Sequence, residues 1–131
     1  MMRMAVCFIA SVFTTLAGAE TALRLEPVDL SIENRKFVGA TIETRMQCFN
    51  VRGSDFRCVD DNGPIIEFIA ADPPETLAML ARRCDTLTKA ASPRCRFKIR
   101  FVYGDGAISK DSDGGSSMFV FPRKGLITFV K

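Results

Sequence analysis

Residues 38–48 read VGATIETRMQC, and apolar and polar side chains alternate along this stretch. One face carries Val38, Ala40, Ile42, Thr44, Met46 and Cys48, of which only the threonine is polar. The other face carries Gly39, Thr41, Glu43, Arg45 and Gln47. A period of two over this length predicts a long strand with the first face buried and the second in solvent.

The residues that follow predict further strands and one helix. The helix is expected to begin after Asp72 as its N-cap, because Pro73 suits the first helical position and Glu75 completes a capping box. Strong turn signals, Gly53 and Asn62-Gly63 among them, separate the early strands, and residues 104–117 are expected to form a polar loop. The expected segments are strands at 56–60, 65–69 and 95–103, the helix at 72–84, and apolar runs at 118–121 and 126–130 that form either a hairpin or one broken strand.

This order of elements predicts a mainly β protein with one helix, in the order β-β-β-α-β(-β). It is the order of the five-stranded OB barrel, with the helix between the third and fourth strands. The alternative is a small open α+β sheet packed on one helix. A length of 131 residues allows one domain, which we expect at residues 38–131 after a lead-in at 20–37 that contains a short helix.

The first 19 residues predict a secretory signal peptide. They contain one basic residue, an apolar run of about a dozen residues and the small residues Ala17-Gly18-Ala19 before the expected cleavage site. An N-terminal membrane anchor is the alternative, although polar residues dilute the apolar run. Cleavage after Ala19 removes Arg3 and Cys7, so no membrane span remains and the net charge falls from +3 to +2.

Cleavage also leaves an even number of cysteines, which in a small exported domain predicts disulfides. Four cysteines allow three connectivities. We favour Cys48–Cys58, which flank the first turn, and Cys84–Cys95, which would tie the helix to the next strand. Their spacing does not match the close pairs of a zinc site, and no Cys-x-x-Cys redox motif occurs.

The sequence offers little for catalysis. It has no histidine, which excludes His-based triads and His metal sites. Asp60 and Asp61 are adjacent, so on a strand they point to opposite faces and cannot act together. A calcium loop from Asp111 would need Gly where Ser116 stands and Glu where Pro122 stands. We therefore expect a non-enzyme with no catalytic residues, no metal and no cofactor.

A basic stripe is the candidate binding face. Arg96, Lys98 and Arg100 alternate with apolar residues and so share the outer face of one strand, and three arginines on the first two strands are expected nearby: Arg45, Arg52 and Arg57. The alternative is a solvated strand face without a ligand. Nucleic acid is not the expected partner, because the phenylalanines next to these charges point inward, which leaves only Phe49 and Phe56 near the rim for base stacking.

The stretch NRKFVGATIE, residues 34–43, resembles the start of exported bacterial OB-fold domains of the tRNA_anti-like group. The resemblance covers residues 30–103, and Ala40 stands where the group usually has Lys. For a periplasmic member it implies the fold rather than an RNA ligand, and it assigns no functional residues.

Together these observations predict an exported, disulfide-stabilised, OB-like binding or adaptor module of the bacterial envelope, periplasmic or secreted. Its expected partner is an envelope protein or an anionic glycan, and its oligomeric state is left open. The alternative is a secreted host-interaction factor resembling OB-type toxin subunits. A small hydrolase and a single-stranded nucleic-acid binder are less favoured.

Overall fold

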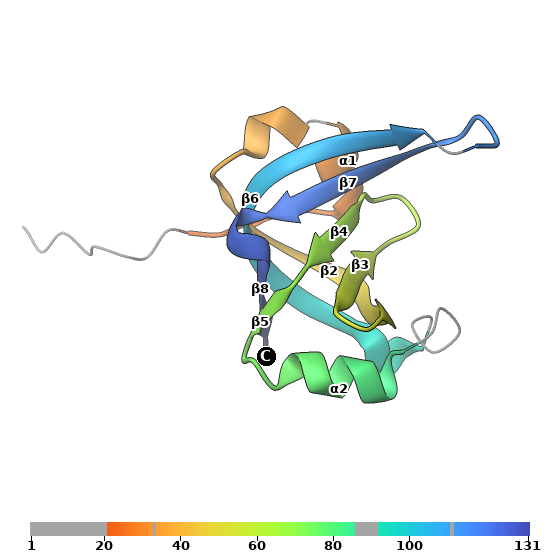
Figure 1. Cartoon of the computed structure of the whole chain (residues 1–131). Coiled ribbons are helices and arrows are strands. Elements are labelled where there is room, and N and C mark those ends of the chain that lie inside the picture. The colour runs from red at the N-terminus through yellow and green to blue at the C-terminus, as the bar shows by residue number, and fades with distance from the viewer. Residues whose placement is uncertain (1–20, 33, 86–91, 111) are drawn as a thin grey trace, which may run out of the picture.

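The structure is a computed structural model that describes residues 21–32, 34–85, 92–110 and 112–131, so the predicted leader at 1–19 lies outside the described residues. The described part is mainly β, with a mixed sheet and two α-helices (Figure 1). Its elements are β1 (Leu23–Arg24), α1 (Pro27–Ile32), η1 (Asn34–Phe37), β2 (Thr41–Arg52), β3 (Asp55–Val59), β4 (Ile65–Phe68), β5 (Ala70–Asp72), α2 (Thr76–Arg83), η2 (Pro93–Cys95), β6 (Arg96–Lys110), β7 (Ser116–Pro122), η3 (Arg123–Gly125) and β8 (Leu126–Val130).

Five of the strands pair in cyclic order. β2 pairs antiparallel with β3 and with β6, β3 pairs antiparallel with β4, and β7 pairs antiparallel with β6. β4 and β7 complete the cycle as a parallel pair. The remaining strands extend this arrangement, since β1 adds to β2, β8 adds to β6, and β5 pairs with β8.

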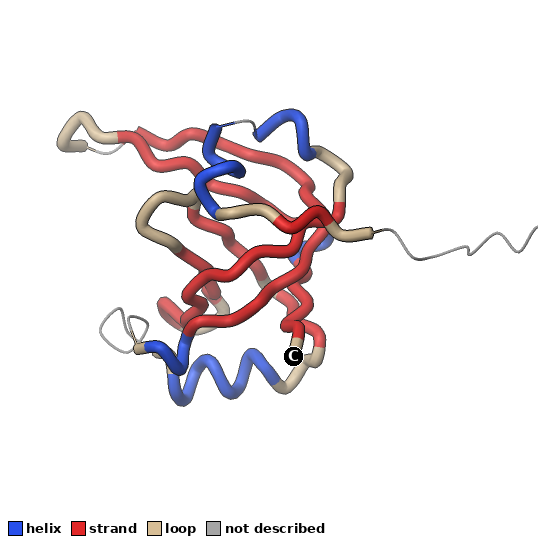
Figure 2. Tube along the Cα trace, turned by 180° about the vertical axis from the view of Figure 1, so that it is seen from behind, coloured by secondary structure: helices blue, strands red, loops and turns tan. Residues whose placement is uncertain are grey.

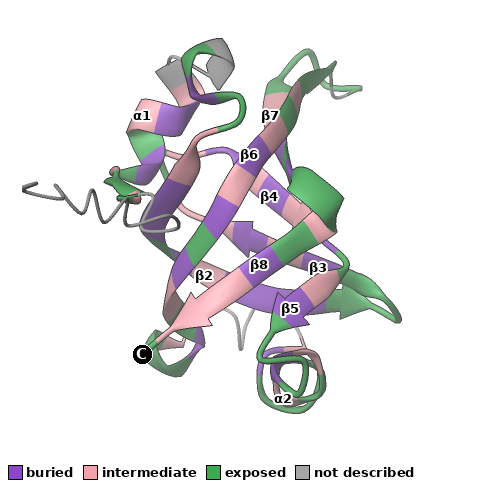
Figure 3. Ribbon diagram, turned by 90° about the vertical axis from the view of Figure 1, so that its left-hand side faces the viewer, coloured by how far each residue is buried: buried purple, intermediate pink, exposed green. Residues whose placement is uncertain are grey.

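The core lies between the inner faces of these strands, and buried positions alternate with more exposed ones along β3 and β4, whereas β2 also has buried residues on its other face (Figure 3). Ile42 and Met46 on β2 are fully buried, as the alternation predicts, and so is Ile99 on β6, directly opposite Thr44. Other fully buried core residues are Cys48, Cys58, Ile66, Leu80, Val120 and Ile127. Val38 differs from the prediction: it precedes β2 and is 55% exposed.

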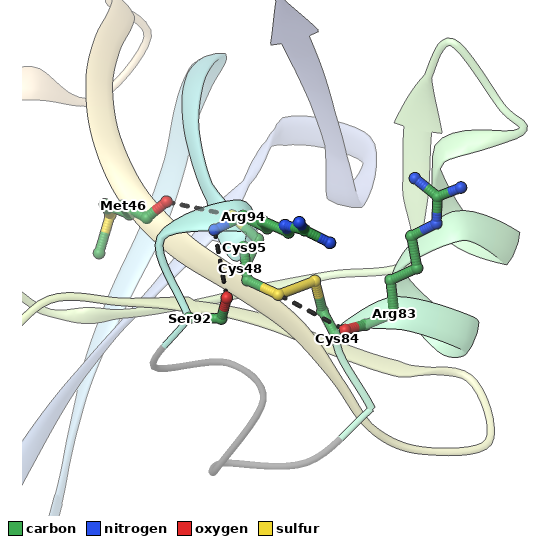
Figure 4. Close-up of a disulfide and its surroundings, with 7 residues drawn as sticks. All are labelled: Met46, Cys48, Arg83, Cys84, Ser92, Arg94 and Cys95. Atoms are coloured by element: carbon green, nitrogen blue, oxygen red, sulfur yellow. Dashed lines mark hydrogen bonds between the residues drawn. A yellow bond between two sulfur atoms is a disulfide. The ribbon is translucent and has the colours of Figure 1, made fainter.

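Two disulfides link the elements in the favoured connectivity. Cys48 and Cys58 are directly paired across β2 and β3, with Cα atoms 4.0 Å apart. Cys84, the C-cap of α2, and Cys95, the last residue of η2 before β6, form the second disulfide, with Cα atoms 6.0 Å apart (Figure 4). The backbone N–H of Asn50 donates to the carbonyl oxygen of Cys84, so the same corner is also hydrogen-bonded to β2.

The predicted start of the helix is wrong. Asp72 is the last residue of β5 and pairs with Thr128 on β8, so the chain is still extended where the cap was expected. The peptide bond between Asp72 and Pro73 is cis, and α2 begins at Thr76. A strand partner far away in the sequence thus overrides a local capping pattern.

The predicted polar loop at 104–117 is also wrong for most of its length. β6 continues to Lys110 and pairs with β7 back to Ser116, because these polar residues satisfy their backbone groups in a two-stranded ribbon. Gly104 permits this path: a Cβ there would lie 2.6 Å from the carbonyl oxygen of Phe121 and 3.0 Å from the nitrogen of Arg123.

The lead-in is part of the fold. β1 pairs parallel with the start of β2, and at the start of α1 the backbone N–H of Glu26 donates to the carboxylate of Asp29. In the described part of the chain, no helix is both long enough and apolar enough to cross a membrane. Through the pairing of β1 with β2, the lead-in lies against the outer face of β2, which the sequence pattern predicts to be exposed to solvent.

Candidate anion-binding cleft

The register of β2 and β6 brings most of the basic stripe together. Arg45 lies directly opposite Lys98, and Gln47 lies directly opposite Arg96. Side chains of directly paired residues project from the same face of a sheet. The alternation that buries Ile42 and Ile99 therefore collects these cations on the outer face.

A cleft of about 560 Å³ lies on this face, between the lead-in and the two strands. Figure 2 shows the helical turns of the lead-in lying together beside the strands. The cleft is lined by Arg24, Leu25, Glu26, Asp29, Glu43, Thr44, Arg45, Arg96 and Lys98. Its size falls within the range of pockets for small ligands.

Glu43 forms the wall of the cleft and was not predicted as a site residue. Its side chain is only 6% exposed and forms ion pairs with Arg24, at 3.1 Å, and with Arg100, at 3.2 Å. The backbone N–H of Leu25 donates to the carbonyl oxygen of Glu43, which holds the lead-in on β2. The sequence signal that could have identified Glu43 is its position as the one carboxylate on the face of residues 39–47 that is predicted to be polar.

The charges around Glu43 keep it ionised. Burial by itself raises the pKa of this carboxyl, but the hydrogen bond from Arg100 and the positive charges of Lys98 and Arg24 outweigh burial and hold the pKa below its ordinary value of 4.5. A lowered pKa means that the folded state favours the carboxylate. Glu43 is therefore a fixed negative charge that orders the cations around it.

This pKa shift predicts a loss of stability in acid. The contribution of ionised Glu43 is complete above its ordinary, unfolded pKa of 4.5 and is lost as the pH falls through the lower folded pKa. Between about pH 6 and pH 3, the wild type should therefore lose more free energy of unfolding than Glu43→Gln, which cannot titrate there. Urea denaturation at both pH values measures this, and an equal loss in the two proteins would contradict it.

Two cations on the floor of the cleft form no ion pair at contact distance with a described residue, although the charge of Lys98 acts on Glu43 from further away. Among the described residues, neither Arg45 nor Lys98 forms an ion pair, although they lie opposite each other, where like charges repel. Arg96 forms an ion pair with Asp60 at 3.5 Å. An anionic group bound between Arg45 and Lys98 would remove this repulsion.

The other predicted stripe residues do not line this cleft. Arg100 is on the same face but its guanidinium binds Glu43. Arg57 is opposite Phe49, four residues along β2 from Arg45, which is roughly 13 Å along a strand. Arg52 is the exposed last residue of β2. The six predicted residues thus divide: Arg45, Arg96 and Lys98 line the cleft, whereas Arg52, Arg57 and Arg100 do not.

A pair of outward-facing aromatic rings was also missed. Phe119 and Phe121 on β7 have parallel rings with centroids 6.4 Å apart, and Phe121 is 36% exposed. The guanidinium of Arg57 lies 5.8 Å from the ring centroid of Phe119 and is also paired with Glu67 at 3.0 Å. Residues 118–121 read MFVF, so no polar alternation marks which of them face outward.

The fold and the cleft define a small disulfide-linked β domain with a cationic outer face. No protein-family model, no curated protein and no solved structure matches this chain.

Proposed function

We propose that this protein is an exported, non-enzymatic binding module of the OB type that takes an anionic glycan into the cleft between its lead-in and β2–β6. The observation that carries the proposal is the pair Arg45 and Lys98, which lie opposite each other and form no ion pair with a described residue. Positively charged side chains that form no ion pair within the protein are available to bind an anionic ligand.

The OB assignment is supported by the cyclic pairing of β2, β3, β4, β7 and β6. A five-stranded Greek-key barrel has this kind of closed neighbour relation. Along the chain, α2 lies between β4 and β6, where an OB domain places its helix between the third and fourth strands. β1, β5 and β8 would then be additions to the barrel.

Export is supported by the two disulfides and by the leader-like start of the chain. Disulfides form and persist in oxidising compartments such as the bacterial periplasm or the extracellular space. A small domain gains more from such links than a large one, because its core is limited. We therefore place the protein in the periplasm or outside the cell.

The lining of the cleft favours a glycan over an acidic protein segment. Besides its cations, the cleft carries the carboxylates of Glu26 and Asp29. Carboxylates accept hydrogen bonds from hydroxyl groups, in which sugars are rich, whereas they repel an acidic peptide. A ligand with both acid groups and hydroxyl groups therefore complements the cleft best.

The charge state of the cleft supports binding rather than catalysis. A general acid needs a carboxyl whose pKa is raised toward the working pH. The pKa of Glu43 is lowered instead, and its carboxylate is occupied by Arg24 and Arg100. We therefore assign Glu43 to the ordering of the binding site.

A pair of matched ligands tests this function. Isothermal titration with an oligosaccharide of uronic acids should give saturable binding that weakens as salt increases, since ion contacts are screened. The neutral oligosaccharide of the same length, in which each carboxylate is reduced to the alcohol, should bind at least about tenfold more weakly. Equal binding of the two oligosaccharides, or no binding of the acidic one, would overturn the proposal.

A further inference from the structure

A second cationic cleft lies at the other edge of the same face and is separate from the proposed glycan site. It has a volume of about 290 Å³ and lies between β6, the start of β2 and the corner at η3. The lining residues are Thr41, Arg100, Phe101, Val102, Arg123, Lys124, Leu126 and Thr128. Among the described residues, three cations line this cleft and no carboxylate does.

The sheet register explains why these groups meet. Arg100 lies opposite Thr128 on β8 and opposite Glu43 on β2, so its guanidinium stands at the border between the two clefts. Thr41 lies opposite Val102 in the next pair along. Thr41 and Thr128 therefore lie on either side of β6 in the lining of the cleft.

The corner at η3 supplies the other two cations. Neither Arg123 nor Lys124 forms an ion pair with a described residue, and Lys124 has a φ of 59°, a left-handed conformation that is rare outside glycine. The guanidinium of Arg123 lies across Gly39, where an added Cβ would be 3.6 Å from Nη2. The close approach of Gly104 to the backbone at Phe121 and Arg123 fixes this corner on β6.

These donors fit a phosphoryl group better than a carboxylate. Even with Nη2 of Arg100 bound to Glu43, the two guanidinium groups, the ammonium and the Thr128 hydroxyl offer more hydrogen-bond donors than the two oxygens of a carboxylate can accept. A phosphate monoester presents three terminal oxygens and close to two negative charges at neutral pH, and Arg binds such a group through two parallel hydrogen bonds. Leu126, 37% exposed, adds an apolar side to the cleft.

We infer that the cleft of Arg100, Arg123 and Lys124 binds a phosphate monoester, either a small molecule or the headgroup of a lipid such as phosphatidic acid. The site does not depend on the glycan cleft, because Arg45 and Lys98 do not line it. The chemistry common to both sources is a tetrahedral dianion or monoanion held by these three cations.

The test compares two phosphoryl sources on the same protein. NMR titration of the chain with glycerol 1-phosphate should shift the amide signals of residues 123–128, and sedimentation should show whether the chain binds vesicles that contain phosphatidic acid, a lipid phosphate monoester, but not vesicles of phosphatidylcholine alone. Binding to the vesicles alone assigns the site to a lipid headgroup, and binding to the ester in solution assigns it to a small phosphate. If neither probe binds, the inference is wrong.

Variants decide whether binding uses this cleft. Arg123→Gln with Lys124→Gly removes two of the three cations, and glycine keeps the left-handed backbone, so the fold should be retained. Affinity for the bound probe should fall about tenfold or more, because charge-assisted hydrogen bonds are lost. The matched control, Lys110→Gln with Arg82→Gln, removes two exposed cations from β6 and α2 and should leave affinity unchanged.

The same binding assay separates this inference from the proposed function. Arg45→Gln with Lys98→Gln should leave phosphoryl binding within about twofold of the wild type, because neither residue lines the second cleft. An equal loss of affinity in this variant and in the Arg123/Lys124 variant would show only a general effect of positive charge and would overturn the inference. Failure of glycan binding has no bearing on this result.

Discussion

Replacing all four disulfide cysteines with alanine is expected to leave the chain largely unfolded at 37 °C. The disulfides join residues that are 10 and 11 positions apart. Closing a loop of this length restricts the unfolded chain and so raises the free energy of unfolding by about 3 kcal/mol for each disulfide. Together, about 6 kcal/mol is comparable to the whole stability of many domains of this size, which begins at about 5 kcal/mol.

Urea denaturation of the two single-pair variants provides the control. Cys84→Ala with Cys95→Ala should lose about 3 kcal/mol but stay folded, since the hydrogen bond from Asn50 to Cys84 uses backbone atoms that remain. Cys48→Ala with Cys58→Ala should lose a similar amount and leaves the β2–β3 pairing to hold the corner. A four-alanine variant with the wild-type midpoint would contradict the structural role of the disulfides.

Arg45→Gln with Lys98→Gln is expected to lower the affinity for the acidic oligosaccharide about a hundredfold. Each substitution removes a charge-assisted hydrogen bond, and two such bonds account for at least about 3 kcal/mol. The fold should tolerate the change, because the substitution removes two like charges from directly opposite positions. Isothermal titration gives the affinity, and urea denaturation checks that stability is not reduced.

The matched control for the charge change is Arg82→Gln with Arg83→Gln. These two residues end α2 and are exposed, so the control removes the same net charge from a distant surface. Its affinity should stay within about twofold of the wild type once salt is at a physiological level, where distant charges are screened. If both double variants lose affinity equally, the protein attracts the ligand by its net charge and has no defined cleft.

Much of the fold was predictable because side-chain alternation is a local signal. Ile42, Met46 and Cys48 are fully buried as the pattern of residues 38–48 predicts. The disulfide connectivity was predictable because each pair flanks one connection between neighbouring elements. The strand from residue 95 was expected to end near 103 and instead continues to Lys110, because pairing with β7 depends on a partner that no local pattern reveals.

The candidate site was predictable only in part. Arg45 on β2 and the residues Arg96 and Lys98 on β6 line the same cleft, because the register of the two strands places their outward-facing positions side by side. Arg57 on β3 follows the same alternation, but it pairs with Phe49, which is four residues along β2 from Arg45. No local sequence pattern shows this offset. The alternation predicted that the side chain of Glu43 is exposed to solvent. In the structure the lead-in covers this side chain, because β1 pairs parallel with β2 beside it.

The most direct test of the proposed function is a map of amide NMR shifts during titration with the acidic oligosaccharide. The largest shifts should occur at Arg45 and Lys98 on the floor of the cleft and at Leu25 on its wall. Saturation should follow the affinity measured by isothermal titration. Shifts that concentrate instead on Phe119 and Phe121 of β7, with Arg45 and Lys98 unchanged, would contradict the assignment of this cleft as the binding site.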